Sequence, residues 1–438
     1  IRLLQSTAFD WIQPAAVISV ASADDVAKTI AFARATNQPF TIRSGGHSYC
    51  GWSTGEGLVI DTRALAGLGS AEADGTYAVG AGTQLVDLYE GLDALGLAVA
   101  GGSCPTVGLG GLALGGGHGL TSRNYGLTCD AVAAVEIITA DGTVRRCDAV
   151  NEPDLFWAVR GGGGSFGVVT RFFIAPHPTP PSAVTFTFKY SWQTAHAALA
   201  AWMAWLPSQP NTMMSTARFE NSTSLLLDVN GLFLGSLADA KSLLAPLLSH
   251  PTTSQNITAR RFVDALLLEA GCLHTDQTAC HTATNPGGTL DRSSPFVATS
   301  LFFDAALPDA AIESARQQVA QRVAGAQVAA IQFDSYGGAI ASIAPDATAF
   351  VHRNAFVVAQ CSSYYNTGDG TADRAWVRAT HDALAPFSNG ESYQNYVDAG
   401  LPNFAQAYYG ANLPRLQQLK AQYDPANVFS FPQSVPLP

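Results

Sequence analysis

The sequence predicts an α+β protein of more than one domain, because the pattern of apolar and polar residues changes once along the chain. Before residue 176, short apolar strands alternate with short amphipathic helices. A proline-rich break, PHPTPP at 176–181, then interrupts the chain. Beyond residue 182 the strands alternate apolar with polar residues, as in VTFTFKY at 184–190, which is typical of antiparallel sheets. We therefore expect a domain boundary at the break, followed by a large antiparallel sheet covered by helices.

The composition is typical of a compact, loop-rich protein and argues against two classes of partner. Hydrophobic residues make up 47% of the 438 residues and charged residues only 13%, against an average of about 25%. With a net charge of −11 and no basic stripe, we expect no nucleic-acid partner. No apolar run reaches the roughly 18 residues of a membrane helix, so we expect no membrane span. Because the chain begins at Ile1, we interpret its N-terminus as processed, with any export signal outside the sequence.

The first elements place a glycine pair and a histidine at the end of a strand. Residues 16–20 form an apolar strand, and Ser22 begins a helix with Asp25 as its capping-box partner. The strand 40–43 follows and runs directly into the glycines of TIRSGGHSYC. A turn needs glycine but not an imidazole, and α/β folds place ligands at strand ends. His47 is therefore either an ordinary loop residue or a group that contacts a ligand.

The remaining elements follow from the same periodicities. The strands that we expect are 58–61, 77–79, 184–190, 225–233, 297–303, 327–334 and 351–360. The helices that we expect are 83–95 (capped by Thr83), 194–206, 237–249, 309–324 and 413–423. VAAVEIITADGTVRRC at 132–147 reads as a hairpin around Asp141-Gly142.

Seven cysteines occur without a CxxC pair. Cys272 and Cys280 bracket a short polar loop, GCLHTDQTAC, and we expect a local disulfide between them, which implies an oxidising compartment. A zinc site that adds His274 and His281 is the alternative, although this spacing fits no common zinc finger.

The glycine content is highest in GGSCPTVGLGGLALGGGHG at 101–119. Such density indicates close approach of the backbone to a ligand or to other backbone. Gly108, Gly110 and Ala113 match the dinucleotide pattern G-x-G-x-x-A, with Asp130 further on. This match is weak, because no clean strand precedes it and Asp130 begins a strand instead of ending one.

Cys104 lies before Pro105 within this glycine-rich segment. Taken alone, it reads as a small buried thiol, the usual fate of cysteine. Taken with His47, it places two nucleophilic side chains beside glycine turns in one predicted domain. Cys–His hydrolysis is one use of such a pair. However, Cys104 lacks the helix start that normally lowers the pKa of a catalytic thiol.

Several motifs together resemble the berberine-bridge-enzyme-like FAD-linked oxidases of the vanillyl-alcohol-oxidase/PCMH flavoprotein superfamily. They are RSGGHSYCGWST, GSCPTVGLGGLALGGGHG, SRNYGLTCD, LFWAVRGGGGSFGVVT and the segment from NYVDAGLPNF to FSFPQS. The resemblance runs almost end to end and is strongest over 40–170 and 390–438. It implies a PCMH-type FAD-binding domain of residues 1–178 and 390–438, and a substrate domain of residues 179–389 with the large antiparallel sheet.

The resemblance also implies how the cofactor is held. In this family the histidine after R-S-G-G is bonded to the flavin 8α carbon, and the cysteine of G-x-C-P-T-V to flavin C6. It therefore implies FAD bound covalently through both His47 and Cys104. The other cofactor-binding residues that it implies are Arg43, Ser44, Gly45, Gly46, Ser48, Pro105, Thr106, Gly108, Gly110, Gly111, Gly115, Gly116, Gly117, His118, Gly119, Gly167, Val168, Val169 and Asn427.

Three catalytic assignments follow from the resemblance. YQNYVD at 393–398 is similar to the family motif Y-x-N-Y-x-D, which implies Tyr396 as the base, unless both tyrosines are sheet aromatics. Gln360 occupies a region where relatives place a Gln or Glu against the substrate, and Tyr336 is a weaker candidate. Val107 implies an oxygen-reactive flavin, because a leucine there would fill the space beside flavin C4a.

The function that this implies is an FAD-dependent oxidase. We expect it to oxidise an alcohol or hemiacetal carbon of a sugar, oligosaccharide or secondary metabolite and to reduce O2 to H2O2. The alternatives are a flavin dehydrogenase with a non-oxygen acceptor and a non-catalytic carbohydrate- or flavin-binding protein. We further expect a monomer that is secreted or periplasmic. His118 departs from the tyrosine, isoleucine or phenylalanine that we expect in this glycine motif.

Overall fold

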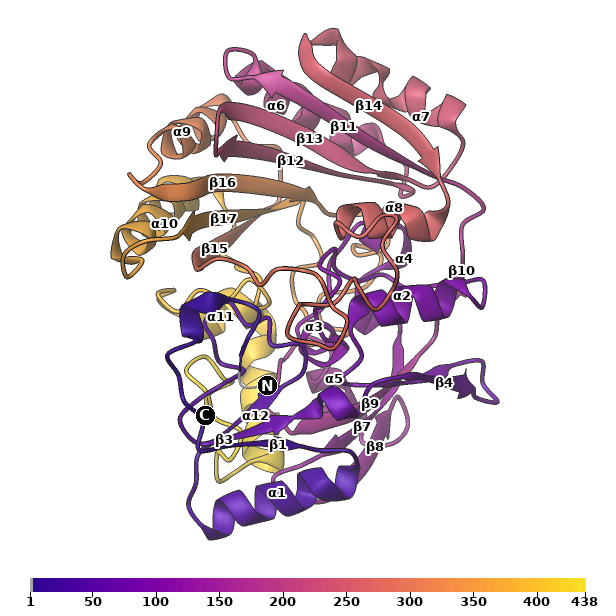
Figure 1. Cartoon of the computed structure of the whole chain (residues 1–438), viewed down its shortest axis with the longest axis vertical. Coiled ribbons are helices and arrows are strands. Elements are labelled where there is room, and N and C mark those ends of the chain that lie inside the picture. Colours follow the sequence, from indigo (N-terminus) through magenta and orange to yellow (C-terminus); the bar gives the residue numbers. More distant parts are fainter. Residues whose placement is uncertain (1–2) are drawn as a thin grey trace.

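The computed structural model describes residues 3–438 and has an α+β fold in two halves (Figure 1). The lower half in Figure 1 holds a three-stranded parallel sheet and a five-stranded antiparallel sheet. The upper half holds one seven-stranded antiparallel sheet. The predicted fold class is confirmed. No helix within residues 3–438 combines the length and the apolar character that crossing a bilayer requires.

The three-stranded sheet has the order β1-β3-β2. Its strands are β1 (Ala16–Ser19), β2 (Phe40–Arg43) and β3 (Leu58–Asp61). Helix α1 (Ala23–Ala35) joins β1 to β2, and its predicted cap is confirmed, because the Asp25 N–H donates to Ser22 Oγ at 3.1 Å. The glycine pair and His47 follow the C-terminal end of β2. Ligands commonly bind at this end of the strands in a parallel sheet.

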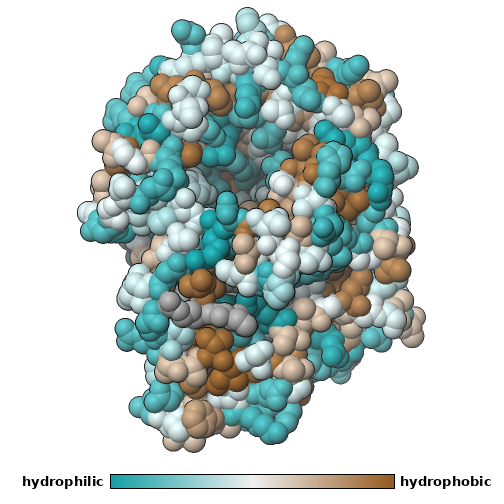
Figure 2. All heavy atoms as spheres, in the orientation of Figure 1, coloured by the Kyte–Doolittle hydropathy of each residue, from teal (hydrophilic) through white to brown (hydrophobic). Residues whose placement is uncertain are grey.

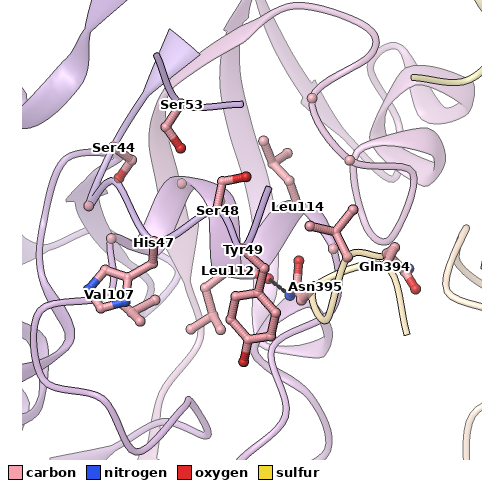
Figure 3. Close-up of a pocket in the computed structure, with 18 of the residues that line it drawn as sticks. Ser44, His47, Ser48, Tyr49, Ser53, Val107, Leu112, Leu114, Gln394 and Asn395 are labelled. Carbon is pink, nitrogen blue, oxygen red and sulfur yellow. Dashed lines mark hydrogen bonds between the residues drawn. The ribbon is translucent and has the colours of Figure 1, made fainter. Parts of the chain in front are cut away.

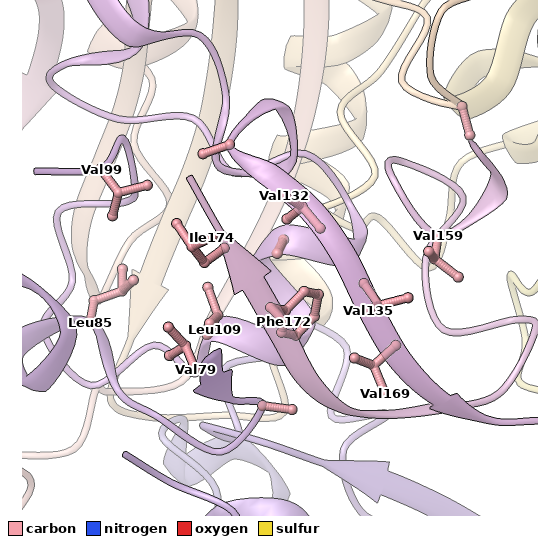
Figure 4. Close-up of a cluster of buried hydrophobic side chains, with 14 of the residues drawn as sticks. Val79, Leu85, Val99, Leu109, Val132, Val135, Val159, Val169, Phe172 and Ile174 are labelled. Carbon is pink, nitrogen blue, oxygen red and sulfur yellow. The ribbon is translucent and has the colours of Figure 1, made fainter. Parts of the chain in front are cut away.

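The five-stranded sheet has the order β4-β5-β9-β7-β8. Its strands are β4 (Leu68–Ala71), β5 (Tyr77–Gly80), β7 (Val132–Ile138), β8 (Val144–Asp148) and β9 (Val168–Ile174). The predicted hairpin is formed by β7 and β8. Apolar side chains of this sheet pack against helix α2 (Leu85–Asp93) and its neighbours to form the core of the lower half (Figure 4). The prediction that Thr83 caps this helix is wrong: Gln84 is the N-cap residue, and Thr83 Oγ1 accepts from the Gly67 N–H at 2.9 Å.

Short elements fill the connections of the lower half. They are η1 (Thr7–Phe9), η2 (Thr62–Ala64), β6 (Leu97–Ala98), α3 (Leu109–Leu114), α4 (Ser122–Tyr125), η3 (Thr128–Asp130), α5 (Pro153–Ala158) and β10 (His177–Pro178).

The seven-stranded sheet has the order β14-β11-β13-β12-β16-β17-β15. Its strands are β11 (Ala183–Ser191), β12 (Met213–Asn221), β13 (Leu225–Phe233), β14 (Thr252–Arg260), β15 (Phe296–Phe303), β16 (Ala326–Ser335) and β17 (Val357–Tyr365). Strands β12 and β14 lie outside the predicted set. The strand expected at 351–360 begins only at Val357, because Arg353 is instead held in a buried ion pair with Asp130 at 2.7 Å.

Helices cover one face of this sheet and leave the other face polar. The helices of the upper half are α6 (Ala195–Trp205), η4 (Leu206–Ser208), α7 (Leu237–Leu244), η5 (Ala245–Ser249), α9 (Asp309–Ala320), α10 (Thr371–Leu384) and η6 (Ala385–Phe387), whereas α8 (Phe262–Glu269) packs against α2 of the lower half. Apolar strand residues such as Phe219, Ile331 and Cys361 pack against α6, α9 and α10. Alternate residues must point the other way, which turns Gln332, Asp334 and Gln360 toward the lower half.

The last segment of the chain returns to the lower half. Helices α11 (Phe404–Tyr409), η7 (Gly410–Asn412) and α12 (Leu413–Tyr423), in yellow, lie beside the indigo N-terminal strands (Figure 1). At the end of α12, Lys420 Nζ donates to Asp424 Oδ2 at 2.6 Å, and both side chains are fully buried. The Asp424 carboxylate also accepts from the Val428 and Phe429 N–H groups. This packing supports our proposed division of the chain near residues 178 and 390.

The predicted disulfide between Cys272 and Cys280 is confirmed. The bond uses both thiols and so leaves the zinc alternative without its sulfur ligands. The loop that it closes lies against α2, where Asp87 accepts from Gln277 at 2.9 Å and contacts His281 at 3.2 Å. The disulfide thus fixes the segment directly after α8.

Candidate active site

A cavity of about 530 Å³ extends from the end of β2 to the polar face of the seven-stranded sheet. Figure 2 shows the surface hollowed between that sheet and α8, with mostly hydrophilic residues around the opening. We name two sides of the cavity. The glycine wall comprises loops within 44–48, 102–120 and 163–169. The sheet wall comprises Thr216, Glu269, Gln332, Asp334, Gln360 and Tyr364.

Two loops of the glycine wall contact each other through bare backbone. A Cβ atom on Gly45 would lie 2.2 Å from the Gly108 nitrogen, and one on Gly108 would lie 2.0 Å from Ser44 Oγ. Real Cβ atoms do not approach that closely, so both positions need glycine. Ser44 Oγ in turn donates to the Ala81 carbonyl at 2.7 Å. The contact fixes the segment that carries His47 beside the segment that carries Cys104.

His47 and Cys104 both line the cavity. His47 Nε2 and Thr106 Oγ1 lie 2.8 Å apart in a hydrogen bond. Burial lowers the pKa of His47 to about 4, so the imidazole is neutral at physiological pH. Cys104 is the exposed one of the five free cysteines within residues 3–438. Cys104 lines the cavity, and desolvation raises the pKa of its thiol.

Val107 lies beside His47 in the same wall (Figure 3). Its backbone is fixed by its neighbours, because its N–H donates to the Cys104 carbonyl and its carbonyl accepts from the Leu85 N–H at 3.0 Å. The side chain is half-buried and forms part of the cavity surface. An increase in its size would therefore reduce the space next to His47.

The glycine wall fits an extended, polar cofactor such as FAD. Gly111 and Gly164 line the cavity, and a Cβ at either would meet nothing within 4 Å, so bare backbone faces the space. Three lining residues also have a buried polar atom without a partner among the described residues: Thr41 Oγ1, His118 Nε2 and Gln394 Oε1. Exposed peptide groups and unsatisfied side-chain polar atoms are what a dinucleotide with its pyrophosphate and ring would engage.

Most of the predicted cofactor-binding residues line this cavity. Those that do are Ser44, Gly45, Gly46, His47, Ser48, Cys104, Gly108, Gly110, Gly111, Gly115, His118, Gly119, Gly167, Val168 and Val169. Six lie behind or beside it: Arg43, Pro105, Thr106, Gly116, Gly117 and Asn427. Arg43 is buried in an ion pair with Asp61 at 2.8 Å. Asn427 is an exposed turn residue with a φ of 52°.

The alternative dinucleotide pattern does not use Asp130 as a ligand for ribose. Asp130 is paired with the buried Arg353 through two hydrogen bonds of 2.7 and 2.8 Å. It also accepts from the Leu127 N–H at 2.8 Å. The side chain is therefore saturated by structural contacts that join β7 to the loop before β17.

Tyr396 lines the cavity where the two walls meet, and its partner is Asp334 on β16. Burial raises the pKa of Asp334 to about 7, although its contacts with Gln332 and Tyr396 act to lower it. Gln332 Nε2 also donates to Asp334 Oδ1 at 2.8 Å. Burial and the Asp334 charge raise the pKa of Tyr396 well above its usual value. The pair thus combines a neutral phenol with a carboxylate that titrates near neutrality.

Gln360 is hydrogen-bonded to the loop that contains His47. Its Nε2 donates to Tyr49 Oη at 2.6 Å, and the Tyr49 ring stacks on Tyr396 with centroids 5.8 Å apart. Figure 3 shows the Tyr49 ring next to the Asn395 side chain. The Gln360 amide therefore connects the sheet wall to the glycine wall.

Tyr393 has a structural role, in contrast to Tyr396. Its hydroxyl accepts from the Gly117 N–H at 2.9 Å, from the His118 N–H at 3.2 Å and from Asn395 Nδ2 at 3.0 Å. Asn395 also donates to the Leu112 carbonyl, as the dashed line in Figure 3 marks. These bonds join the segment that holds Tyr396 to the glycine wall.

His118 stacks on Tyr336, with ring centroids 4.6 Å apart and an interplanar angle of 13°. Burial lowers the pKa of His118 to about 4, so the ring is neutral. Tyr336 is also buried, and it does not line the cavity. The unexpected histidine is thus a flat ring packed against an aromatic one, as the usual aromatic residue would be.

Sequence reasoning missed Asp334, Tyr49 and Glu269 as cavity residues. Tyr49 lies two residues after His47, and that spacing could have suggested it. Asp334 occupies one of the polar positions in the alternation of β16, which predicts its face but not its partner. Nothing in the sequence around Glu269 distinguishes it from a solvent-exposed helix end.

The fold and the cavity define a flavin-dependent oxidoreductase, and comparisons with known proteins agree. A family model described as FAD binding domain matches residues 14–148, and one described as berberine and berberine like matches residues 392–436. The FAD-linked oxidoreductase YvdP of Bacillus subtilis, itself uncharacterised, is 32% identical over 97% of this chain and 93% of its own length.

Of two further relatives, one is named for its enzyme activity and the other has a solved structure. A xylooligosaccharide oxidase of Thermothelomyces thermophilus is 27% identical over 96% of this chain and 87% of its own length. The solved structure of BBE-like 1 from Physcomitrella patens superimposes with a TM-score of 0.91 at 27% identity, covering 100% of this chain and 94% of that one. The chain therefore belongs to the berberine-bridge-enzyme-like family of FAD-linked oxidoreductases, which bind FAD and act on small molecules.

Proposed function

We propose that the protein is an oxidase that takes hydride from an alcohol or hemiacetal carbon of a sugar, oligosaccharide or secondary metabolite and reduces O2 to H2O2. The observation that carries the proposal is the Tyr396–Asp334 pair at the meeting point of the two walls. FAD, when bound, supplies the hydride acceptor and then the reductant for O2. The polar sheet wall offers hydrogen-bonding groups to the hydroxyls of such a substrate.

The pKa values of the pair indicate how the substrate proton leaves. Because the pKa of Tyr396 is well above 10, a free phenolate is scarce at neutral pH. Tyr396 can still accept the proton of the substrate hydroxyl if its own proton moves to Asp334 in the same step. Asp334, with a pKa of about 7, is in its carboxylate form at and above neutrality. Tyr396 is then the catalytic base, and Asp334 is the proton acceptor behind it.

We also propose that FAD is attached through both His47 and Cys104. A neutral imidazole and an accessible thiol on adjoining loops of one cavity support this attachment. Val107 beside His47 supports an oxygen-reactive flavin, because a valine leaves room that a leucine would fill.

We further infer that the protein resides in an oxidising compartment, either secreted or periplasmic. The Cys272–Cys280 disulfide supports this inference, since such bonds persist outside the reducing cytosol.

The experiment is a peroxide-release screen of mono- and oligosaccharides, phenolic alcohols and glycosylated metabolites, with flavin bleaching under anaerobic conditions as a parallel readout. The proposal expects some members to bleach the flavin and to release one H2O2 per turnover. Bleaching without peroxide would identify a dehydrogenase. A panel that neither bleaches the flavin nor yields peroxide would identify a binding protein.

A further inference from the structure

Glu269 is a charged group of the cavity that the proposed chemistry does not use. It is the last residue of α8 and lines the cavity on the side of the seven-stranded sheet. Its charge influences both the Cys104 thiol and the Asp334 carboxyl, so it lies near each of them. Figure 2 shows the surface hollow next to α8, the helix that ends at Glu269.

The position of Glu269 is rigidly supported. Val263 and Leu267 of α8 pack against Val86 of α2. The Cys272–Cys280 disulfide, which belongs to the same apolar cluster, follows three residues after Glu269. The helix end is therefore fixed on the lower half of the molecule, while its carboxylate faces the cavity.

The other charged side chains on the face of the seven-stranded sheet that is turned toward the lower half have partners. Arg218 pairs with Glu220 at 3.3 Å, and Lys189 lies 4.0 Å from Asp228. Asp334 is bonded by Gln332 and Tyr396. Within residues 3–438, Glu269 has neither a hydrogen bond nor an ion pair.

The local charge balance is negative. Among residues 3–438, the charged groups that act on Asp228 and Glu269 are Arg218, Lys189 and Glu220, and Glu269 in turn acts on Asp334, so four carboxyl groups share two cations. Asp228 Oδ1 is also buried without a hydrogen-bond partner among the described residues. Glu269 is exposed where α8 meets the cavity; desolvation by its surroundings raises its pKa, Asp228 raises it further, and Arg218 opposes them. A cation placed here would relieve a carboxylate that the protein itself leaves uncompensated.

We propose that Glu269 binds a cationic amino group of the substrate, so that the site prefers amino sugars and amino-substituted alcohols over their neutral counterparts. This inference rests on the proposed oxidase function for its substrate. It assigns Glu269 a role in specificity and leaves the proton transfer to Tyr396 and Asp334.

The test uses matched neutral and amino probes on the flavin-loaded protein: glucose with glucosamine, cellobiose with the disaccharide of chitosan, and the methyl glycosides of glucose and glucosamine. The readouts are binding, from the difference spectrum of the oxidised flavin, and anaerobic flavin reduction. The methyl glycosides lack the anomeric hydroxyl, so they cannot be oxidised at the hemiacetal carbon, and flavin reduction by them would report oxidation of another alcohol carbon. We expect the amino member of a pair to bind about tenfold more tightly at pH 7.5.

Two variants sharpen the test. Glu269→Gln should reduce the preference to within about twofold, whereas Asp264→Asn removes a carboxylate from the same helix at a position outside the cavity and should leave the preference unchanged. The preference should also fall as the pH is lowered through the raised pKa of Glu269, because protonation removes its charge.

The outcomes separate this inference from the proposed function. Equal binding of both members of every pair, a preference that survives in Glu269→Gln, or no binding of any amino probe overturns the role of Glu269. Flavin reduction by neutral sugars alone, with no effect of Glu269→Gln, overturns the inference and leaves the oxidase proposal intact. Preferential binding of amino probes without any flavin reduction supports Glu269 and counts against the oxidase.

Discussion

The glycine wall presents backbone to the cavity, whereas the sheet wall presents polar side chains from neighbouring strands. Gly45 and Gly108 allow two loops to touch, and Gly111 and Gly164 leave peptide groups bare. In the sheet wall, on the other side of the cavity, Gln332 of β16 is paired with Gln360 of β17 in the strand register. A backbone surface constrains the sequence tightly, because almost any side chain would obstruct it. A side-chain surface can change its specificity without changing its fold.

Loss of both proposed attachment residues, His47 and Cys104, should have the largest effect on the glycine wall. Denatured, washed wild-type protein should stay yellow, with a mass increased by one FAD. Cys104→Ala should keep the flavin through His47, and the His47→Ala/Cys104→Ala double variant should release all of it on denaturation. Cys50→Ala is the control and should behave as the wild type. Complete release of flavin from acid-precipitated wild type would refute the attachment.

Removal of the proposed base should slow the chemistry while leaving the flavin bound. Tyr396→Phe should reduce the rate of flavin reduction at saturating substrate by a factor of about 10²–10⁴, as loss of a general base typically does. Tyr364→Phe removes a hydroxyl from the same cavity and should change the rate little. Rapid mixing under anaerobic conditions measures both, and an unimpaired Tyr396→Phe would remove this residue from the mechanism.

The pH profile should report Asp334. The proton acceptor must be deprotonated, so the flavin-reduction rate of wild type should rise as the pH increases through about 7. Asp334→Asn cannot accept the proton, so its rate should lie about 10- to 100-fold lower at pH 8 and lose that inflection. An inflection near 7 that persists in the variant would assign it to another group.

The backbone contact of the glycine wall can be broken directly. Gly108→Ala forces a Cβ against Ser44 Oγ and the Gly45 nitrogen and should lower the unfolding free energy by about 1–3 kcal/mol. Gly111→Ala meets nothing in the protein, and an alanine within α3 should not destabilise it. Thermal unfolding of the flavin-free proteins compares the two. Equal stability of both variants would contradict the close contact.

Val107→Leu is expected to have the smallest effect. The extra methylene should slow reoxidation of the reduced flavin by O2 about tenfold while leaving reduction by substrate nearly unchanged. The second-order rate of reoxidation after anaerobic reduction measures this change. A variant that reoxidises as fast as wild type would show that Val107 does not control access of O2.

The two walls also differ in how well the sequence predicts them. The positions of Gly45, Gly108 and His47 at a strand end and in a glycine-rich segment were predictable, because bare backbone requires a distinctive composition. Asp334 and Glu269 were not, because an acidic residue on a strand or at a helix end has no local signature. Their roles depend on pairing across the sheet and on packing of α8, which are contacts between residues far apart in the chain.

Some boundaries were mispredicted for a related reason. The run Val351–Arg353 has strand-like residues, but the ion pair of Arg353 with Asp130 holds it as a loop. The helix expected at 237–249 is α-helical only as far as Leu244, where α7 ends. It continues as the 3-10 helix η5, since Pro246 has no N–H to donate to an α-helical hydrogen bond. In the first case a long-range ion pair, and in the second the covalent ring of proline, outweighed the local sequence pattern.

The position of Tyr396 late in the chain has a consequence for biosynthesis. Tyr396, the segment 428–433 that lines the cavity and the buried Lys420–Asp424 pair are all translated after every strand of the three main sheets. A nascent chain can therefore form the loops of His47 and Cys104 long before the cavity that surrounds them is closed. Flavin loading into a complete site must then follow synthesis of residue 433, and ribosome-bound chains that stop short of α11 should fail to retain the cofactor in its final environment.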